Sequence, residues 1–421
     1  MIRRLFKLSF VRKCNYWRYY LYHQWYAKSL KKKEHINVVF LCMNVPMWKC
    51  GHVFDLLRKN NRFKVYLFLS PAKNFAYQQR CNDLKEMRAF FTERGIDYID
   101  FELEADKPPV PIRDVVEPDL VFYPQPYPGT FEDVHSYEYF IKKLILYVPY
   151  AFVSRNAQYY DFNSEFSNLA WRLYYPTEES RKIAVGATFI HGRNVVVTGY
   201  SSADDYSLPM TKDPWKTIDQ PMKRIVWAPH FTIRQRLGFS QISNFLEVAD
   251  YMKLLAGEYH DKVQFAFKPH PRLYTELCKY PDWGKERANE YYDFWRNGTN
   301  TQLETSDFID LFKGSDALIH DSGSFTIDYL YFGKPVLYDN PNIEDAKRTG
   351  TPICQMAYDM HYKSKTLTDI KHFIDEVVLA GNDTMKEERM EFCNKYLMPS
   401  NGMSVARNIY LDIIQSLAIY E

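Results

Sequence analysis

A short polar turn in the last third of the sequence has the residue types of an anion site. Residues 317–319 are apolar and predict a buried strand, residues 320–324 read His-Asp-Ser-Gly-Ser, and residues 325–332 carry apolar side chains at helical spacing. Residues 333–335, Gly-Lys-Pro, end the helix before a second strand over 336–338. Such a strand, turn and helix direct backbone N–H groups and the positive helix end toward an anion. The pattern predicts a diphosphate site at the carboxyl edge of a parallel sheet.

Ser322, Gly323 and Ser324 are the predicted phosphate ligands, because the glycine leaves room for the anion and the hydroxyls can donate to it. Serine and glycine are also ordinary helix caps, so the turn alone favours phosphate only modestly. A second polar segment, Lys268-Pro-His-Pro271, follows an apolar run over 263–267 that predicts another strand. We therefore expect two strand ends of one sheet to form the site, with Lys268 among the phosphate ligands.

Two histidines are the candidates for catalysis. His270 lies close to Lys268, and both can neutralise the charge that builds on a leaving group, although Pro-His-Pro is also an ordinary turn with a solvated ring. His230 follows Ala228-Pro229 at another predicted strand end, where an imidazole suits a general base near neutral pH. With 11 histidines in the chain, a chance placement near a site is the alternative for either.

Asp321, His320 and Asp328 are the predicted ligands of the donor nucleotide. Asp321 has the alternative role of capping the helix that follows it, and His320 closes the strand, so its ring can point to either face. Asp328 lies on the helix, where its carboxylate can accept hydrogen bonds from ribose hydroxyls. The alternative for Asp328 is a buried pair with Lys334.

Short apolar runs alternate with helical patterns along the whole chain, which predicts doubly wound parallel sheets. Strands are predicted at 36–43, 63–69, 98–101, 120–123, 144–148, 194–198, 224–227, 263–267, 317–319 and 336–338. Helices are predicted at 48–58, 75–94, 177–190, 241–256, 306–313, 325–332, 366–380, 384–396 and 403–418, with further helices within 272–296. The polar stretch 201–220 has no clear periodicity and is predicted to link two domains.

Composition limits the possible cofactors and compartments. The 421 residues, 46% of them hydrophobic, are enough for two domains with separate cores. The seven cysteines are scattered without a Cys-x-x-Cys pair, so disulfides and structural zinc are not expected. We therefore expect the protein in a reducing compartment. No Asp-x-Asp pair follows a predicted strand, so neither a metal nor another cofactor is expected.

The first 33 residues are basic and aromatic. They hold ten Lys or Arg and no acidic residue, whereas the rest of the chain has 44 basic and 52 acidic residues. The segment lacks the apolar length of a membrane span or signal peptide. We expect it to lie on an anionic membrane surface. Packing of a helix on the domain is the first alternative. Nucleic acid is not expected as a partner, because the remainder is acidic.

Several of these segments together resemble the CDP-glycerol glycerophosphotransferase family, the teichoic-acid primases and polymerases with capsule relatives. The resemblance lies in Ala228-Pro229, Lys268-Pro-His-Pro271, the stretch 321–328 and Gly333-Lys-Pro335, and it extends to the segment 197–204. It covers residues 195–345 best. It implies a GT-B fold, in which two Rossmann-like domains face a central cleft and the C-terminal one binds the donor nucleotide.

The resemblance also implies a function and a place. Family members are peripheral membrane enzymes on the cytoplasmic side that extend lipid-linked glycans. Their N-terminal domain has a His-Gly-Thr-like motif that is not found here, and residues 125–128, Gln-Pro-Tyr-Pro, are expected to occupy the corresponding loop. The expected domains are a membrane-surface segment 1–34, an acceptor domain 35–200, the linker 201–220, a donor domain 221–400 and a closing helix 401–421.

The expected reaction moves a glycerol-phosphate or other polyol-phosphate unit from a CDP-activated donor to a lipid-linked glycan, with release of CMP. The expected location is the inner face of the cell membrane. One alternative is a glycosyltransferase of the same fold that uses a nucleotide-sugar, because the Ser-Gly-Ser turn would then hold the leaving diphosphate. A nucleotide-sugar epimerase shares the Asp-Ser-Gly turn but has no use for the basic leader. A membrane-attached scaffold without activity is the remaining alternative.

Overall fold

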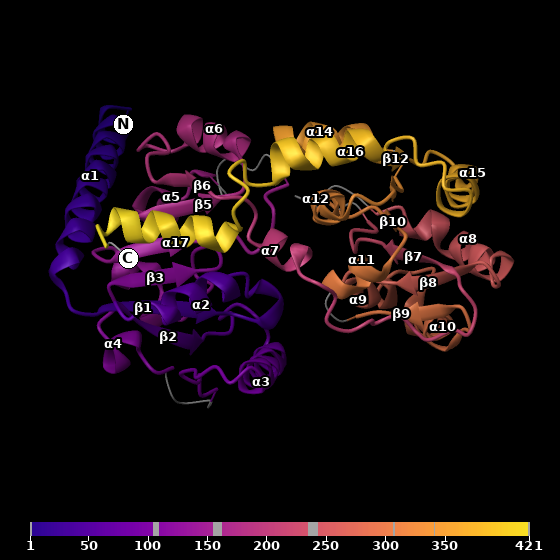
Figure 1. Ribbon diagram of the computed structural model, residues 1–421, viewed down its shortest axis with the longest axis horizontal. Coiled ribbons are helices and arrows are strands. Elements are labelled where there is room, and N and C mark those ends of the chain that lie inside the picture. The colour runs from indigo at the N-terminus through magenta and orange to yellow at the C-terminus, as the bar shows by residue number, and fades with distance from the viewer. Residues whose placement is uncertain are drawn as a thin grey trace. The chain divides into compact units, whose positions relative to one another are not determined.

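The chain forms two compact units, each built on its own sheet. The computed structural model describes residues 2–103, 109–154, 162–234, 243–305, 308–340 and 342–419, with the backbone alone described for 2–10. Over these residues, unit 1 comprises the chain up to Val153, residues 162–204, and the chain from Met398 onward. Unit 2 comprises Ser154 and the chain from Asp205 to Leu397. Figure 1 labels their elements.

Unit 1 contains a sheet of six parallel strands in the order β2-β1-β3-β4-β5-β6. The strands are β1 (Ile36–Cys42), β2 (Phe63–Leu69), β3 (Leu120–Tyr123), β4 (Leu144–Tyr147), β5 (Arg172–Tyr175) and β6 (Val195–Val197). Its helices are α1 (Ile2–Ser29), α2 (Gly51–Lys59), α3 (Tyr77–Glu93), α4 (Ile112–Val115), α5 (Glu165–Leu169), α6 (Glu178–Ala187) and α17 (Val405–Ser416). Strands β1, β3 and β4 in the middle of the sheet are almost continuously apolar and buried, as in parallel sheets with both faces covered.

Unit 2 repeats this arrangement with six parallel strands in the order β12-β11-β10-β7-β8-β9. The strands are β7 (Lys223–Ala228), β8 (Val263–Phe267), β9 (Thr301–Leu303), β10 (Ala317–His320), β11 (Val336–Tyr338) and β12 (Tyr362–Lys363). The helices are α8 (Phe245–Glu258), α9 (Leu273–Cys278), α10 (Gly284–Asn297), α11 (Ile309–Gly314), α12 (Phe325–Asp328), α13 (Ile343–Thr349), α14 (Pro352–Asp359), α15 (Leu367–His372) and α16 (Lys386–Phe392). Helix α7 (Ser202–Ser207) spans the change from one unit to the other.

Most predicted strands are confirmed, and the exceptions have physical reasons. The strand predicted at 98–101 is wrong, because only Ile99 pairs there, in a single parallel bridge with Phe68. Strands β5, β9 and β12 escaped prediction; β9 and β12 are short, and polar residues interrupt their sequences. Within the segment predicted as a linker, Trp215 is 4% exposed and donates its Nε1–H to the carbonyl of Leu311, so this part packs on unit 2.

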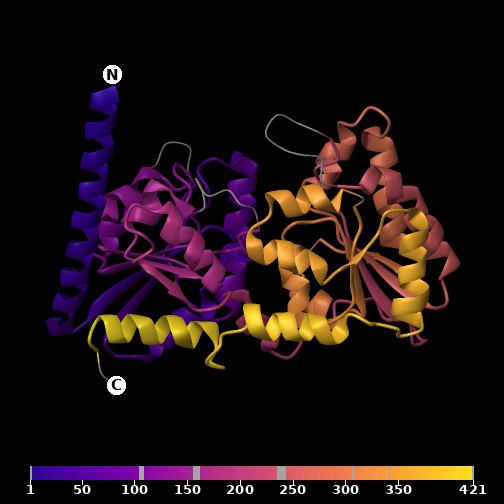
Figure 2. The same cartoon turned by 90° about the horizontal axis from the view of Figure 1, so that it is seen from above.

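The second half of α1 packs on unit 1. Tyr16, His23 and Ala27 are buried, and His23 Nε2 lies 2.7 Å from the carbonyl oxygen of Ile141. The Tyr26 hydroxyl and the Lys33 ammonium both bind the buried carboxylate of Asp119. One face of this part of the segment therefore packs on the domain, and its contact with a membrane stays a prediction; both views show α1 along one side of unit 1 (Figure 1, Figure 2). No helix in the described residues is long and apolar enough to cross a membrane.

The closing helix α17 returns to unit 1. Its residue Asp412 accepts hydrogen bonds from Arg172 and Tyr174, which belong to β5. The carboxylate of Asp204 accepts the backbone N–H groups of Val405 and Ala406 at the start of α17, both at 2.8 Å. These bonds satisfy amides that have no partner inside the helix.

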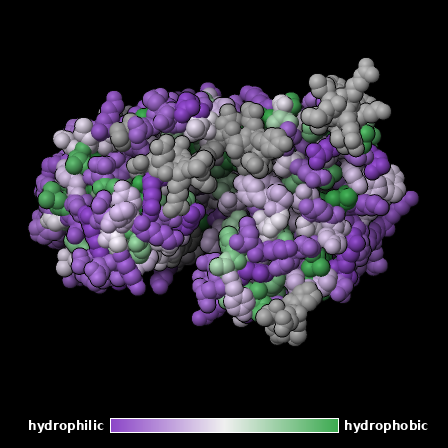
Figure 3. All heavy atoms as spheres, turned by 180° about the vertical axis from the view of Figure 1, so that it is seen from behind, coloured by the Kyte–Doolittle hydropathy of each residue, from purple (hydrophilic) through white to green (hydrophobic). Residues whose placement is uncertain are grey.

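Over the face drawn in Figure 3, hydrophilic residues predominate and hydrophobic ones form small separate patches.

Candidate functional site

The predicted site residues of unit 2 follow three adjacent strands. Strand β7 lies between β10 and β8, with His320 in register with Ala228, and Trp227 in register with Phe267. All these strands are parallel, so their carboxyl ends reach the same edge of the sheet. The turn 320–324, His230, and the segment 268–270 therefore lie at one edge. The prediction that these strand ends share an edge is confirmed.

The two candidate catalytic histidines are neighbours at this edge. The ring centroids of His230 and His270 lie 5.0 Å apart with an angle of 69° between the planes. The Phe231 ring centroid lies 4.4 Å from each of theirs, and the Arg272 guanidinium lies over the Phe231 ring, 4.2 Å from its centroid. The backbone N–H of His270 donates to the carbonyl of Pro229, which joins the two loops.

His270 is a neutral hydrogen-bond donor in this arrangement. Burial, with the Arg272 charge second, lowers the pKa of His270 to about 4. Its Nδ1 accepts the backbone N–H of Arg272 at 3.1 Å, so the single ring proton lies on Nε2. A neutral ring with a proton on Nε2 can donate to an anionic oxygen. It therefore stabilises a phosphoryl oxygen by a hydrogen bond rather than by a full positive charge.

His230 is held by its backbone and by one hydroxyl. Its backbone N–H donates to Asp321 Oδ1 at 2.5 Å, and its Nδ1 lies 2.9 Å from the hydroxyl oxygen of Thr232. The backbone N–H of Thr232 also donates to this Nδ1, at 3.4 Å, so in this arrangement Nδ1 is an acceptor and the proton of the neutral ring lies on Nε2. A base at Nε2 requires the other tautomer, in which Nδ1–H donates to the Thr232 hydroxyl, so the role of His230 as a base stays a prediction.

The predicted phosphate turn places its two hydroxyls side by side. Ser322 Oγ lies 3.1 Å from Ser324 Oγ; Ser322 is buried and Ser324 is exposed. The backbone N–H of Ser322 donates to His320 Nδ1 at 3.1 Å, so that amide already has a partner. The helix after the turn is short, with four residues in α12 and a 3-10 turn over 329–332, which Gly333 ends at φ 64°. The predicted anion site therefore offers hydroxyl groups and not the dipole of a long helix.

Asp321 does not cap α12 in the way that the sequence allows. Its buried carboxylate accepts hydrogen bonds from the His230 N–H, and from the hydroxyl of Ser243 and the N–H of Asn244 at 2.8 Å each. Burial raises the pKa of Asp321 to about 7 in spite of these donors. The observed role of Asp321 is to hold the loops around the site, and nucleotide binding by it and by the fully buried His320 stays a prediction.

The alternative pair between Asp328 and Lys334 is wrong. The Lys334 ammonium donates to the backbone carbonyls of Phe312, Lys313 and Ser315, which end helix α11. Asp328 is buried and accepts a hydrogen bond of 2.6 Å from the Tyr206 hydroxyl. A contact between Asp328 and a ribose stays a prediction.

One carboxylate at this edge escaped prediction. Asp339 directly follows β11 and accepts a hydrogen bond of 3.2 Å from the Asn244 side chain, beside the loops that Asp321 holds. Burial raises the pKa of Asp339 to about 6. The sequence signal that could have identified Asp339 is a polar residue directly after a predicted strand. The same signal identified Asp321.

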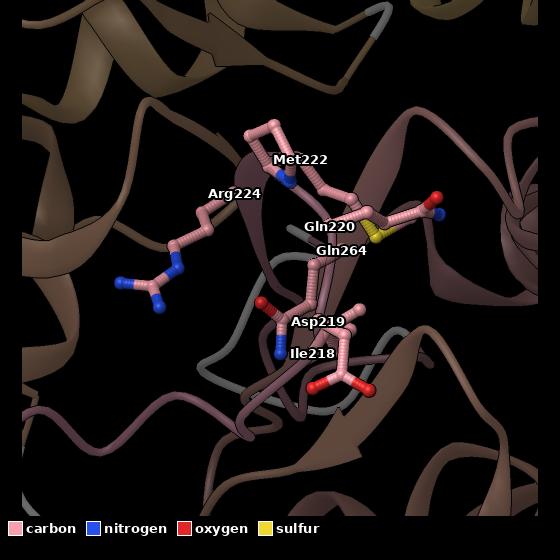
Figure 4. Close-up of a pocket in the computed structure, with 7 residues that line it drawn as sticks. Ile218, Asp219, Gln220, Met222, Arg224 and Gln264 are labelled. Atoms are coloured by element: carbon pink, nitrogen blue, oxygen red, sulfur yellow. The ribbon is translucent and has the colours of Figure 1, made fainter.

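A hollow of about 350 Å³ lies at the opposite edge of the same sheet. Its lining includes Asp219, Arg224 and Gln264, which lie before or near the start of β7 and β8 (Figure 4). It is therefore remote from the strand ends that carry the predicted ligands. In the part of the chain that the structure describes, no group of three or more His, Cys, Asp or Glu side chains is placed to hold a metal ion.

Comparison with known proteins identifies a family. The family described as CDP-glycerol:poly(glycerophosphate) glycerophosphotransferase matches residues 153–414, which is more than half of the chain. No curated protein matches the sequence.

Solved structures show the fold. A variant of the wall teichoic acid polymerase TagF has a TM-score of 0.56 at 12% identity, covering 99% of this chain and 98% of its own. The UDP-GlcNAc 2-epimerase from Neisseria meningitidis bound to UDP-GlcNAc has a TM-score of 0.55 at 17% identity, covering 90% and 99%. These likenesses and the two parallel sheets confirm the predicted GT-B fold. The cleft between its domains stays a prediction.

Replacing Asp321 by asparagine should flatten the pH dependence of stability. The pKa of Asp321 is raised from 3.8 to about 7, so its burial is tolerated below pH 4 and becomes costly as pH rises to 7. The shift corresponds to a loss on the order of 4 kcal/mol in the free energy of unfolding across that range. We expect the free energy of unfolding of Asp321→Asn to fall less over this pH range. Any cost of its altered hydrogen bonds should be the same at every pH. Urea unfolding at about pH 4.5 and about pH 7.5, close to the two ends of this range, measures how far the free energy of unfolding of each protein changes with pH. Equal pH dependence in both proteins contradicts the prediction.

Proposed function

Because the chain belongs to the CDP-glycerol:poly(glycerophosphate) glycerophosphotransferase family, we propose that it transfers a glycerol-phosphate or another polyol-phosphate unit from a CDP-activated donor to a hydroxyl of a lipid-linked glycan. The product belongs to a teichoic acid, a capsule or another surface polysaccharide. The observation that carries the proposal is the convergence of two histidines and a serine turn at the carboxyl edge of the unit 2 sheet.

The proposed step is one phosphoryl transfer. The acceptor oxygen attacks the β-phosphorus of the donor, and the bond from that phosphorus to the bridging oxygen breaks. CMP leaves with the bridging oxygen, and the acceptor proton passes to a base. Such transfers depend mainly on positioning and on neutralisation of charge, which side chains of this edge can supply.

We propose a division of work between the histidines. His230 is the proposed base, in the tautomer whose Nδ1–H donates to the Thr232 hydroxyl and whose Nε2 takes up the acceptor proton. His270 is the proposed donor to a phosphoryl oxygen, because Arg272 occupies its Nδ1. Lys268, with the turn Ser322-Gly323-Ser324, binds the remaining phosphoryl oxygens in this proposal.

A glycosyltransferase that uses a nucleotide-sugar is the second candidate function. The specific observation for it is the fold, which the UDP-GlcNAc 2-epimerase bound to UDP-GlcNAc shares. In that reaction the donor is attacked at its anomeric carbon and a nucleoside diphosphate leaves. The family match favours the phosphoryl transfer. A scaffold without activity would release neither product.

The nucleotide released from CDP-glycerol tests the proposed function. Purified full-length protein with CDP-glycerol and a lipid-linked acceptor should release CMP, because the bond between the two phosphates breaks. Chromatography of the nucleotides distinguishes the outcomes. Release of CDP, or turnover only with nucleotide-sugars, would favour the glycosyltransferase. No turnover with any nucleotide donor would favour the scaffold.

Replacing His270 by alanine should lower kcat/KM by roughly 10²–10³, the usual effect of removing one hydrogen-bond donor to a developing oxyanion. His270→Gln should retain part of the activity, because its amide can donate from nearly the same place. His260→Ala is the matched control, since His260 is exposed at the end of α8, near the other edge of the sheet. Wild-type activity in His270→Ala with a folded protein removes this residue from the mechanism.

The outward face of α1 is the proposed membrane contact. Val11, Leu21 and Trp25 are 55%, 62% and 63% exposed, and the basic residues Arg18 and Lys28 lie on the same helical face. The opposite face of the helix is buried on unit 1. Apolar and basic side chains on one exposed face suit an anionic bilayer surface. The proposed location is therefore peripheral, on the inner face of the cell membrane, where a lipid-linked acceptor is accessible.

Altering that face should weaken binding to anionic vesicles. Each basic side chain near such a surface contributes about 1 kcal/mol, so the triple variant Arg18→Glu, Trp25→Ser and Lys28→Glu should bind at least about tenfold more weakly. The buried side of α1 is unchanged, so the fold should be retained. The control variant reverses the charges of Arg181 and Lys182, which are exposed on α6. Co-sedimentation with vesicles measures the partition, and equal sedimentation of the triple variant and the wild type excludes this face.

A further inference from the structure

Two buried histidines behind the predicted phosphate turn each have a ring nitrogen without a partner among the described residues. His320 ends β10 and is 0% exposed, and His361 lies between α14 and β12 and is 1% exposed. Their ring centroids lie 5.3 Å apart. In each ring the nitrogen without a partner is Nε2. The proposed phosphoryl transfer uses neither of these atoms.

The other ring nitrogens determine where the protons lie. His320 Nδ1 accepts the backbone N–H of Ser322 at 3.1 Å, so the proton of its neutral ring is on Nε2. His361 Nδ1 lies 2.8 Å from the carbonyl oxygen of Ala357, which can only accept, so Nδ1 carries the proton and Nε2 is bare. Burial lowers the pKa of His361 to about 3 and that of His320 well below its usual value, so both rings are neutral. One unpaired nitrogen is therefore a donor and the other an acceptor.

We propose that one buried water joins the two atoms, accepting the Nε2–H of His320 and donating to Nε2 of His361, and that His361 thereby positions the phosphate turn. No direct hydrogen bond joins the two Nε2 atoms, although the ring centroids lie only 5.3 Å apart, and a water can accept from one and donate to the other. Burying a donor and an acceptor unpaired would cost free energy at both atoms, and pairing both with one water avoids that cost.

The water bridge acts on the turn through a single ring. His361 is anchored on the carbonyl of Ala357 in α14, and its Nε2 fixes the orientation of the His320 ring through the water. His320 in turn holds the N–H of Ser322, whose hydroxyl lies 3.1 Å from that of Ser324. The hydroxyls predicted to bind the donor are then oriented before the donor arrives. His361 is a positioning residue, since it acts through His320.

Two substitutions of His361 separate its two hydrogen bonds. In His361→Asn the shorter side chain can still donate to Ala357 but cannot reach the water. In His361→Gln the longer side chain can offer an acceptor near the place of Nε2 but loses the bond to Ala357. The matched controls are His372→Asn and His372→Gln, because His372 is exposed on α15. Thermal melting of each variant establishes that it is folded.

NMR of the full-length protein with isotope-labelled histidine tests the water bridge itself. We expect the ring proton of His320 on Nε2 and that of His361 on Nδ1. We also expect the His320 ring proton to exchange with water at least about tenfold faster in His361→Asn, and to recover in His361→Gln. The reverse placement of either proton, or an exchange rate that His361→Asn leaves unchanged, overturns the inference.

Kinetics with CDP-glycerol as the probe test the effect on the turn, and this part rests on the proposed function. His361→Asn should raise KM for CDP-glycerol about tenfold with less than about a threefold change in kcat, and His361→Gln should restore KM. A loss of active protein would instead lower kcat at constant KM, which overturns the positioning role. If the wild type releases no CMP, the proposed function fails while the NMR result still decides the water bridge.

Discussion

The carboxylate of Asp321 joins the loops that carry the predicted site. It directly follows β10 and accepts hydrogen bonds from the loop after β7 and from the start of α8. Without this buried acceptor, the backbone N–H of His230 would have no partner there, and the loop that carries the proposed base would lose its attachment to the neighbouring strand. The cost is a carboxylate buried inside the protein, and this burial raises its pKa.

The same edge shows how neutral groups can be arranged for phosphoryl transfer. Burial keeps His270 uncharged, and the backbone N–H of Arg272 selects its tautomer. His230 is close enough for ring contact, and its Nδ1 likewise accepts a backbone N–H, that of Thr232, but it has the Thr232 hydroxyl beside it as well. A hydroxyl can accept as well as donate, and this is the difference between the surroundings of the two Nδ1 atoms.

Sequence patterns correctly predicted which candidate residues share one edge of the sheet, because each of them follows its own strand. Lys268, His270 and the turn 320–324 all come directly after apolar runs, and parallel strands bring such positions to one edge. The prediction failed where a partner is distant in the chain. Lys334 is close to Asp328 in sequence, yet its ammonium binds carbonyls of α11, while Asp328 meets Tyr206 from the segment before β7. Helical spacing alone does not reveal which face of a short helix meets which neighbour.

The amino-acid sequence by itself determined the alternation of strands and helices, the polar residues at the strand ends, and a basic aromatic leader. These features are local, since they depend on hydrophobic periodicity and on residue types within a few positions. Only the tertiary structure decided that one face of the leader's second half is buried on unit 1, that Asp321 holds loops instead of capping a helix, and that His361 lies beside His320. Each of these depends on a contact between segments far apart in the chain, and such contacts follow from strand order and packing, which local patterns do not encode.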